Sequence, residues 1–221
     1  MPGSEALRSR SKSQARPQAR ISRGDPRARS GSNACTLTHS PLMPRVLAID
    51  PTTNGFAYAV FEGSDFLLDW GLTQVRPEEK NALCMKRIDA LIARYLPDVL
   101  VLEDCDGKGS RRNRRVRSLI RGIQRLAAKR SVRTRAFSRG QVREVFASLG
   151  RPTKRLIASE IARRLPEFAP RLPRFRSESR PRGLGIYERE AERMSIFDAA
   201  SLAVTYFESQ AKRSKVAAAD A

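Results

Sequence analysis

Three carboxylates stand at positions where an ordinary fold offers them no partner. Asp50 directly follows the apolar residues 46–49, and Glu103 directly follows the apolar residues 99–102. Asp198 lies among Ile, Phe and Ala residues in a stretch with a helical pattern. Burying a carboxylate is costly unless a cation compensates its charge, and carboxylate oxygens suit Mg²⁺ or Mn²⁺. The three residues therefore indicate a divalent-metal site, at which two ions about 4 Å apart activate a water for attack on a phosphodiester.

The arrangement of two predicted strands decides whether Asp50 and Glu103 meet. If residues 46–49 and 99–102 form neighbouring parallel strands, both carboxylates emerge at the same edge of the sheet. Taken alone, an Asp before a proline is an ordinary turn opening. Three such carboxylates from distant segments are better explained together than separately, so we interpret them as one site.

The charge of the chain indicates a polyanionic partner. The sequence has 43 Lys or Arg against 23 Asp or Glu, a net charge of +20. Between Lys108 and Arg143 there are 14 basic residues and no acidic one. A solvated helix face normally mixes signs, so we interpret this run as a phosphate-binding surface. The side chains assigned to nucleic-acid binding are Lys108, Arg111, Arg112, Arg114, Arg115, Arg117, Arg121 and Arg143.

Other residue counts exclude whole classes of chemistry. The single histidine, His39, lies outside any periodic segment, so a Ser-His-Asp or Cys-His mechanism has no base. Three widely spaced cysteines support neither a disulfide framework nor a zinc site. No apolar run approaches the length of a membrane span, so no membrane partner is expected. Any hydrolysis must then depend on carboxylates and metal ions.

The order of the predicted elements indicates an α/β fold. Strands are expected at residues 45–50, 56–61, 66–75, 99–102 and 132–137. Helices are expected between the third and fourth strands, over the basic run, after the caps Ser138 and Thr153, and at about 190–208. This order predicts a mixed five-stranded sheet flanked by helices.

The composition divides the chain into three parts. Residues 1–42 are rich in Arg, Ser and Pro and are predicted to be a disordered basic extension. Residues 43–210 form the predicted folded domain, with a Pro- and Arg-rich loop at 166–188, and residues 211–221 are predicted to be a disordered tail. A cytoplasmic, nucleoid-associated protein is expected. The alternative is that residues 1–42 are an organelle transit peptide.

Four segments together resemble the RuvC family of Holliday-junction resolvases, within the RNase H-like (retroviral integrase) superfamily. The segments are VLAIDPTTNG at 46–55, VLE at 101–103, QVRE with GRPTK between 141 and 154, and FDAASLAVT at 197–205. Each is short, but their order and spacing together match the family over roughly residues 45–207. The resemblance implies an RNase H-like fold.

The resemblance also implies an activity and a set of roles. Asp50, Glu103 and Asp198 match the metal-binding carboxylates, and Lys154 matches a catalytic lysine that stabilises charge on the scissile phosphate. All four are expected to be catalytic. The implied protein is a homodimeric endonuclease that binds two Mg²⁺ or Mn²⁺ ions. It would resolve four-way DNA junctions in recombination and repair by hydrolysing phosphodiester bonds.

Three other hypotheses remain open at this point. The same fold could cleave RNA or RNA/DNA hybrids, as other branches of the superfamily do. Ser195 stands where the family usually has a second acidic residue, which motivates a non-catalytic nucleic-acid-binding protein. A basic architectural protein is the third, and it would bind duplex and junction with equal affinity at fixed salt.

Overall fold

The computed structural model describes residues 43–75, 80–107, 112–173 and 184–219, with the backbone alone for 184–192. The predicted disordered extension at 1–42 therefore lies outside the described residues. Lys108 and Arg111, two residues of the predicted phosphate-binding surface, also lie outside them. Within the described residues, no helix combines the length and the apolar content that a membrane span needs.

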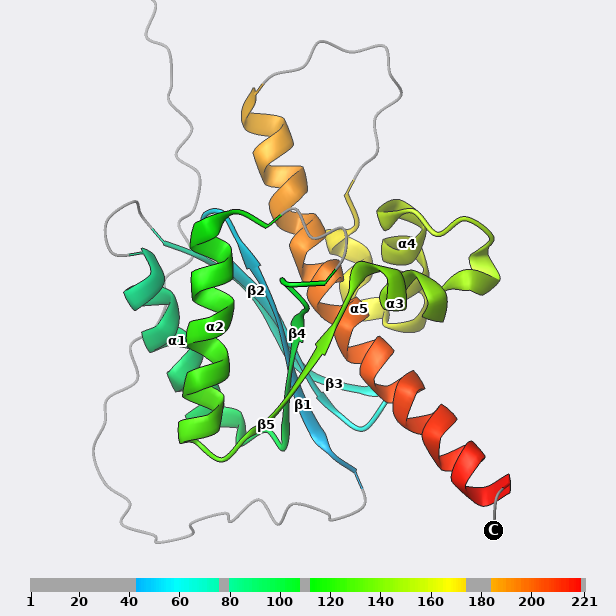
Figure 1. Ribbon diagram of the computed structural model, residues 1–221. Coiled ribbons are helices and arrows are strands. Elements are labelled where there is room, and N and C mark those ends of the chain that lie inside the picture. Colours follow the sequence, from blue (N-terminus) through cyan, green and yellow to red (C-terminus); the bar gives the residue numbers. More distant parts are fainter. Residues whose placement is uncertain (1–42, 76–79, 108–111, 174–183, 220–221) are drawn as a thin grey trace, which may run out of the picture. The chain divides into compact units, whose positions relative to one another are not determined.

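The described residues form one five-stranded sheet in the order β3-β2-β1-β4-β5 (Figure 1). The strands are β1 (Arg45–Thr52), β2 (Gly55–Glu62), β3 (Phe66–Gln74), β4 (Val99–Glu103) and β5 (Arg133–Phe137). β1, β2 and β3 form an antiparallel meander, whereas β4 pairs in parallel with both β1 and β5. This confirms the predicted mixed sheet and the parallel pairing on which the carboxylate site depends.

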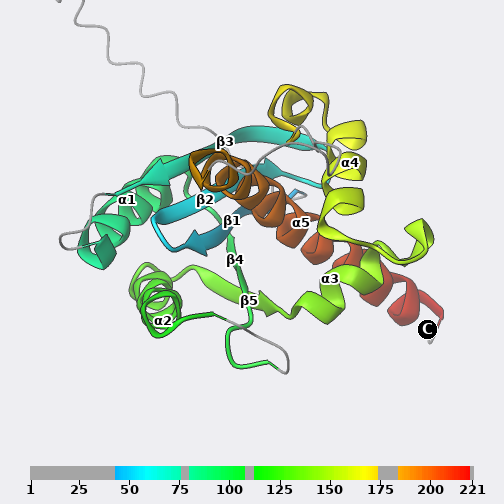
Figure 2. The same ribbon diagram turned by 90° about the horizontal axis from the view of Figure 1, so that it is seen from above.

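Helices cover both faces of the sheet (Figure 2). α1 (Lys80–Tyr95) and α2 (Arg114–Lys129) pack on one face. The other face carries α3 (Arg139–Val145), α4 (Lys154–Arg164) and α5 (Leu184–Ala219). Two short 3₁₀ helices, Ala147–Leu149 and Pro166–Arg171, connect elements on that second face.

The alternation of side chains along β1 and β4 determines where the carboxylates point. In β1, Leu47 and Ile49 pack under α1 and α2, whereas Val46 and Ala48 pack under α5. Successive side chains of a strand point to opposite faces, so Asp50 follows Val46 and Ala48 onto the α5 face. By the same period, the Glu103 side chain of β4 follows Val99 and Val101 onto that face.

A contact lined by small residues holds α5 against the sheet. Ala48, Ala57 and Ala59 of the sheet are buried in the same core cluster as three alanines of α5, namely Ala199, Ala200 and Ala203. Small side chains at a helix–sheet contact let the two backbones approach closely. We name this contact the alanine seam, and it brings Asp198 of α5 close to the sheet.

Aromatic packing closes the core beyond the alanine seam. Phe168 is buried, and its ring lies between those of Trp70 at 5.4 Å and Phe197 at 5.6 Å. Aromatic pairs at these separations add stability beyond the area that they bury. Residues of β3, α5 and the 3₁₀ helix Pro166–Arg171 are thereby fixed together.

Two predicted irregular segments are wrong in part. The final helix was expected at about 190–208 and the residues after 211 in a disordered tail, but α5 runs from Leu184 to Ala219. Residues 210–219 are rich in Ala, Lys and Arg, which are good helix formers, and extending an anchored helix needs no new nucleation. The predicted loop at 166–188 likewise contains a 3₁₀ helix, Pro166–Arg171, and the first residues of α5.

We expect Ser138→Ala to lower the free energy of unfolding by about 1 kcal/mol. The Ser138 hydroxyl accepts a hydrogen bond from the Gln141 backbone N–H at 3.2 Å, and the Gln141 side chain accepts one from the Ser138 backbone N–H at 2.8 Å. This capping box starts α3, and alanine removes the first of its two hydrogen bonds. Urea unfolding measures the change. Ser138→Asp, another good N-cap, should restore stability, and an unchanged midpoint for Ser138→Ala would count against the cap.

Candidate active site

The carboxylates of Asp50 and Glu103 lie side by side on neighbouring strands. β1 and β4 pair in parallel with Ile49 opposite Leu102, so the next residue of each strand is one of the two carboxylates. Asp50 is 2% exposed and Glu103 is 6% exposed. The sequence expected β1 to end at Asp50, but the strand continues to Thr52, so the carboxylate sits within the sheet rather than in a turn.

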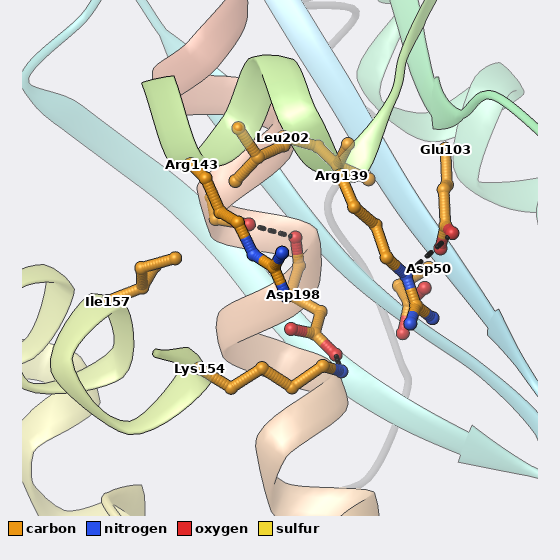
Figure 3. A pocket seen from close by; sticks show the side chains of 10 residues that line it. Asp50, Glu103, Arg139, Arg143, Lys154, Ile157, Asp198 and Leu202 are labelled. Atoms are coloured by element: carbon orange, nitrogen blue, oxygen red, sulfur yellow. Dashed lines mark hydrogen bonds and ion pairs between the residues drawn. The ribbon is translucent and has the colours of Figure 1, made fainter. Parts of the chain in front are cut away.

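Asp198 approaches from α5 with Lys154 as its partner (Figure 3). Its side chain is 26% exposed, and its Oδ2 accepts a short hydrogen bond from the Lys154 ammonium. Lys154 is the first residue of α4, whose N-cap is Thr153 as predicted. Asp50, Glu103, Lys154 and Asp198 line a single pocket, so the four predicted catalytic residues are brought together.

Arg112 joins Asp50 to Glu103. Its Nη2 donates to Asp50 Oδ1 and to Glu103 Oε2, and its Nε donates to Glu103 Oε2 at 2.8 Å. Its Nη1 donates to the carbonyl oxygen of Pro51 at 2.8 Å. The sequence placed Arg112 on an outward phosphate-binding surface. The structure places its guanidinium between the two carboxylates, with only 14% of the side chain exposed.

Arg139 is a site residue that the sequence analysis did not select. Its Nε donates to Glu103 Oε1 at 2.9 Å, so each oxygen of Glu103 is bound by a different arginine. Arg143, which was predicted to bind nucleic acid, lines the same pocket one helical turn further along α3. The sequence signal for Arg139 was its place in the basic run, two residues after the end of β5. That end of β5 lies beside Glu103, because Phe137 pairs with Glu103.

Burial raises the pKa of Asp50 from its ordinary 3.8 to about 7. The attraction of Arg112 lowers this pKa, whereas repulsion from Asp198 and Glu103 raises it further. Burial by itself would lower the pKa of Arg112, but Asp50 and Glu103 raise it, so Arg112 keeps its charge. The three carboxylates therefore share one electrostatic environment, and their mutual repulsion favours a bound cation.

We expect the metal-free wild type to lose stability relative to Asp50→Asn as the pH rises from about 4 to about 7. The pKa of Asp50 is higher in the folded state, so the folded protein retains this proton when the unfolded chain has lost it. The resulting stabilisation is complete below the unfolded pKa and disappears as the pH passes the folded pKa. Urea unfolding in EDTA at several pH values measures the difference. A difference independent of pH would show that Asp50 titrates normally.

The donor set fits a hard divalent cation in its chemistry and its placement. All three candidate ligands are carboxylates, on adjacent strands and on the helix facing them, and oxygen donors of this kind suit Mg²⁺ or Mn²⁺. In this structure Asp50 and Glu103 are both paired with Arg112, and Asp198 is paired with Lys154. Among the described residues, no three acidic, Cys or His side chains are gathered closely enough to hold an ion. An ion held by both Asp50 and Glu103 would take the place of their ion pairs with Arg112.

The arginines of α2 divide into two groups. Arg115 turns inward, where it donates to Asn81 Oδ1 at 2.8 Å and to the carbonyl oxygen of Thr53 at 2.7 Å. These bonds hold the turn after β1, which is a structural role that the sequence analysis did not foresee. The other arginines of α2 line a groove together with Arg112 and Ser118. Its lining residues are Arg112, Arg114, Arg117, Ser118, Arg121 and Arg125. Arg114, Arg117 and Arg121 thus remain candidates for phosphate binding.

Comparisons with known proteins identify the fold. No protein-family model and no curated protein sequence matches the chain. T. thermophilus RuvC in complex with Holliday junction substrate matches with a TM-score of 0.56 and 18% identity, over 76% of this chain and 96% of that chain. A second Thermus thermophilus RuvC structure has a TM-score of 0.53 and 19% identity, over 76% and 96% of the two chains.

The yeast mitochondrial Holliday junction resolvase Ydc2 gives a TM-score of 0.50 and 18% identity, over 78% of this chain and 82% of that chain. At these identities the likeness establishes the fold. The chain has the RuvC-type RNase H-like fold, which confirms the fold that the sequence motifs predicted.

Proposed function

We propose that this chain is a metal-dependent, structure-selective endonuclease that cleaves four-way DNA junctions. One observation carries the proposal: Asp50, Glu103, Asp198 and Lys154 line a single pocket on a RuvC-type fold. Four charged residues from four elements converge there, namely Asp50 of β1, Glu103 of β4, Lys154 of α4 and Asp198 of α5. A hydrolytic site explains their convergence.

Each of the four residues has a proposed role. Asp50, Glu103 and Asp198 would hold two Mg²⁺ or Mn²⁺ ions. When bound, such ions polarise the phosphodiester and activate the attacking water. Lys154 would bind a non-bridging oxygen of the scissile phosphate and stabilise the negative charge that develops in the transition state. Arg139 and Arg143 line the same pocket, where they would position the neighbouring phosphates.

The proposed substrate is branched DNA. The names of the matching structures describe a complex with a Holliday junction and a Holliday junction resolvase. Among the described residues, the charged groups that line the groove on α2 are all arginines. One of them, Arg112, also contacts Asp50 and Glu103 of the pocket. A homodimer would cut two strands of one junction. A cytoplasmic location, with organelle targeting by residues 1–42 as the alternative, stays a prediction.

A non-catalytic junction-binding protein is the second candidate. It is favoured by Arg112, whose guanidinium lies between the two carboxylates that the nuclease needs for metal. It is also favoured by Ser195, a buried residue of α5 one helical turn before Asp198, at the position of the family's usual second acid. In such a protein the Arg112 and Lys154 side chains would neutralise the three carboxylates permanently, in place of a metal ion.

A substrate panel separates these proposals. Four-way junction, linear duplex and RNA/DNA hybrid are incubated with the full chain and Mg²⁺ or Mn²⁺, and products are resolved on denaturing gels. We expect metal-dependent cleavage of the junction in preference to the others. Preferential cutting of the hybrid would favour the RNase H-type alternative. Binding without cutting of any substrate would favour the non-catalytic protein, and equal affinity for junction and duplex would favour an architectural one.

A further inference from the structure

Arg112 belongs to two charged environments at once. On one side its guanidinium contacts Asp50, Glu103 and the Pro51 carbonyl oxygen. On the other side the residue lines the groove with Arg114 and Arg117, and its backbone carbonyl accepts a hydrogen bond from Arg117 Nε at 3.1 Å. A single residue thus borders both the candidate metal ligands and the candidate phosphate-binding groove.

The contacts of Arg112 are incompatible with a cation between Asp50 and Glu103. Nη2 donates to both Asp50 Oδ1 and Glu103 Oε2, and these two carboxylates are among the residues that would hold the metal. Arg139 binds the remaining Glu103 oxygen, Oε1. Keeping a guanidinium beside a divalent cation would bring like charges together in a buried place, where their repulsion is strong. Metal and Arg112 therefore compete for the same oxygens.

Nucleic acid in the groove would offer Arg112 an alternative partner. Among the described residues, the charged groups lining the groove are arginines, so moving the Arg112 guanidinium toward them in the DNA-free protein brings repulsion. A phosphate backbone in the groove reverses the sign of that environment, because guanidinium groups bind phosphate oxygens in bidentate fashion. DNA thus lowers the free-energy cost of releasing Asp50 and Glu103.

We propose that Arg112 is a positioning residue that holds Asp50 and Glu103 in the metal-free protein and moves to a DNA phosphate when metal binds, so that DNA binding and metal binding are positively coupled. The proposal rests on the proposed metal-dependent function and adds an order to it. Linkage requires the coupling to be reciprocal, so DNA tightens metal binding by the same factor as metal tightens DNA binding. The site thereby binds metal more weakly in the absence of its substrate.

The test measures Mn²⁺ affinity by calorimetry on the full chain, with and without a short DNA duplex that junction selectivity leaves intact. For the wild type we expect the duplex to tighten Mn²⁺ binding about tenfold. Arg112→Gln removes the competing charge, so we expect Mn²⁺ to bind about fivefold more tightly without DNA and the duplex to add little. A gel after each titration checks that the duplex is uncut.

Arg135→Gln is the matched control. Arg135 is an exposed arginine of β5, paired with Val101 two residues before Glu103, and it has the same charge as Arg112 without contacting the carboxylates. We expect its Mn²⁺ affinity to stay within about twofold of the wild type, which isolates the contact from a general charge effect. An equal gain in Arg135→Gln and Arg112→Gln would overturn the proposal.

Arg112→Lys covers the case in which Arg112→Gln does not fold. Lysine keeps the charge but lacks the planar fork that reaches both carboxylates, so we expect a smaller gain in Mn²⁺ affinity. Folding of each variant is checked by circular dichroism. Mn²⁺ affinity at or below the wild-type value in the folded variants contradicts the proposal, as does a wild-type affinity that the duplex leaves unchanged.

Failure of this inference and failure of the proposed function give different results. If the wild type cleaves junctions with Mn²⁺ but Arg112→Gln binds the metal no better, the nuclease stands and the role of Arg112 falls. If neither the wild type nor any folded Arg112 variant binds Mn²⁺ or cleaves, the metal-dependent function itself is wrong.

Discussion

Asp50→Asn is expected to lower the rate of junction cleavage by on the order of 10³-fold or more, or about 4 kcal/mol in activation free energy. The substitution preserves the shape of the side chain and removes the charge at the centre of the pocket. Asparagine is a much weaker ligand for Mg²⁺ or Mn²⁺ than a carboxylate. Junction affinity measured in EDTA should stay near the wild-type value, because Asp50 is buried and contributes no contact to phosphates.

Single-turnover cleavage and a gel-shift titration measure the two quantities separately. Asp65→Asn is the matched control, since Asp65 is an exposed acid in the turn between β2 and β3 and does not line the pocket that contains Asp50. Its cleavage rate should equal that of the wild type. Full cutting by folded Asp50→Asn would remove the nuclease assignment, whereas loss of both binding and cutting would indicate a structural role for Asp50.

Lys154→Gln is expected to lower the cleavage rate about 100-fold with little change in junction affinity. The ammonium of Lys154 reaches Asp198 in the pocket, and more than half of its side chain is exposed, so it is accessible to a phosphate. Removing one group that stabilises transition-state charge typically has an effect of this size. Lys154→Arg keeps a cation and should recover part of the rate.

The control for Lys154 is Arg151→Gln, which removes an exposed positive charge three residues earlier in the chain. A rate for Arg151→Gln equal to the wild type would separate the specific role of Lys154 from the general basic charge of this surface. A rate for Lys154→Gln within about twofold of the wild type would leave Lys154 as a structural partner of Asp198 alone.

Much of the fold was readable from local patterns. The continuous apolar runs at residues 46–49 and 99–102 indicated both strands, and each run ends directly before a carboxylate. Ser138 and Thr153 marked two helix starts correctly, because capping is a local hydrogen-bonding property of the chain. The pairing of β1 with β4 is not local, and from the sequence it was only a condition for the two carboxylates to meet at one sheet edge.

The details of the site depended on contacts that local patterns do not encode. Arg112 lies 62 residues from Asp50 in the sequence, and nothing in its own neighbourhood distinguished it from the other arginines of the basic run. Arg115 was likewise assigned to phosphate, although it holds the turn after β1. A basic run identifies a charged surface, but which of its members turn inward depends on the carbonyl and carboxylate groups that folding brings beside them.

The alanine seam determines the tolerances of the proposed catalytic centre. Ala48, Ala57 and Ala59 of the sheet share a core cluster with Ala199, Ala200 and Ala203 of α5, and small side chains on both elements let Asp198 lie near the sheet carboxylates. The length of the connection that precedes α5 does not enter this spacing. Homologues with connections of very different lengths would therefore retain the same catalytic spacing, whereas one larger side chain in the seam would displace an entire catalytic helix.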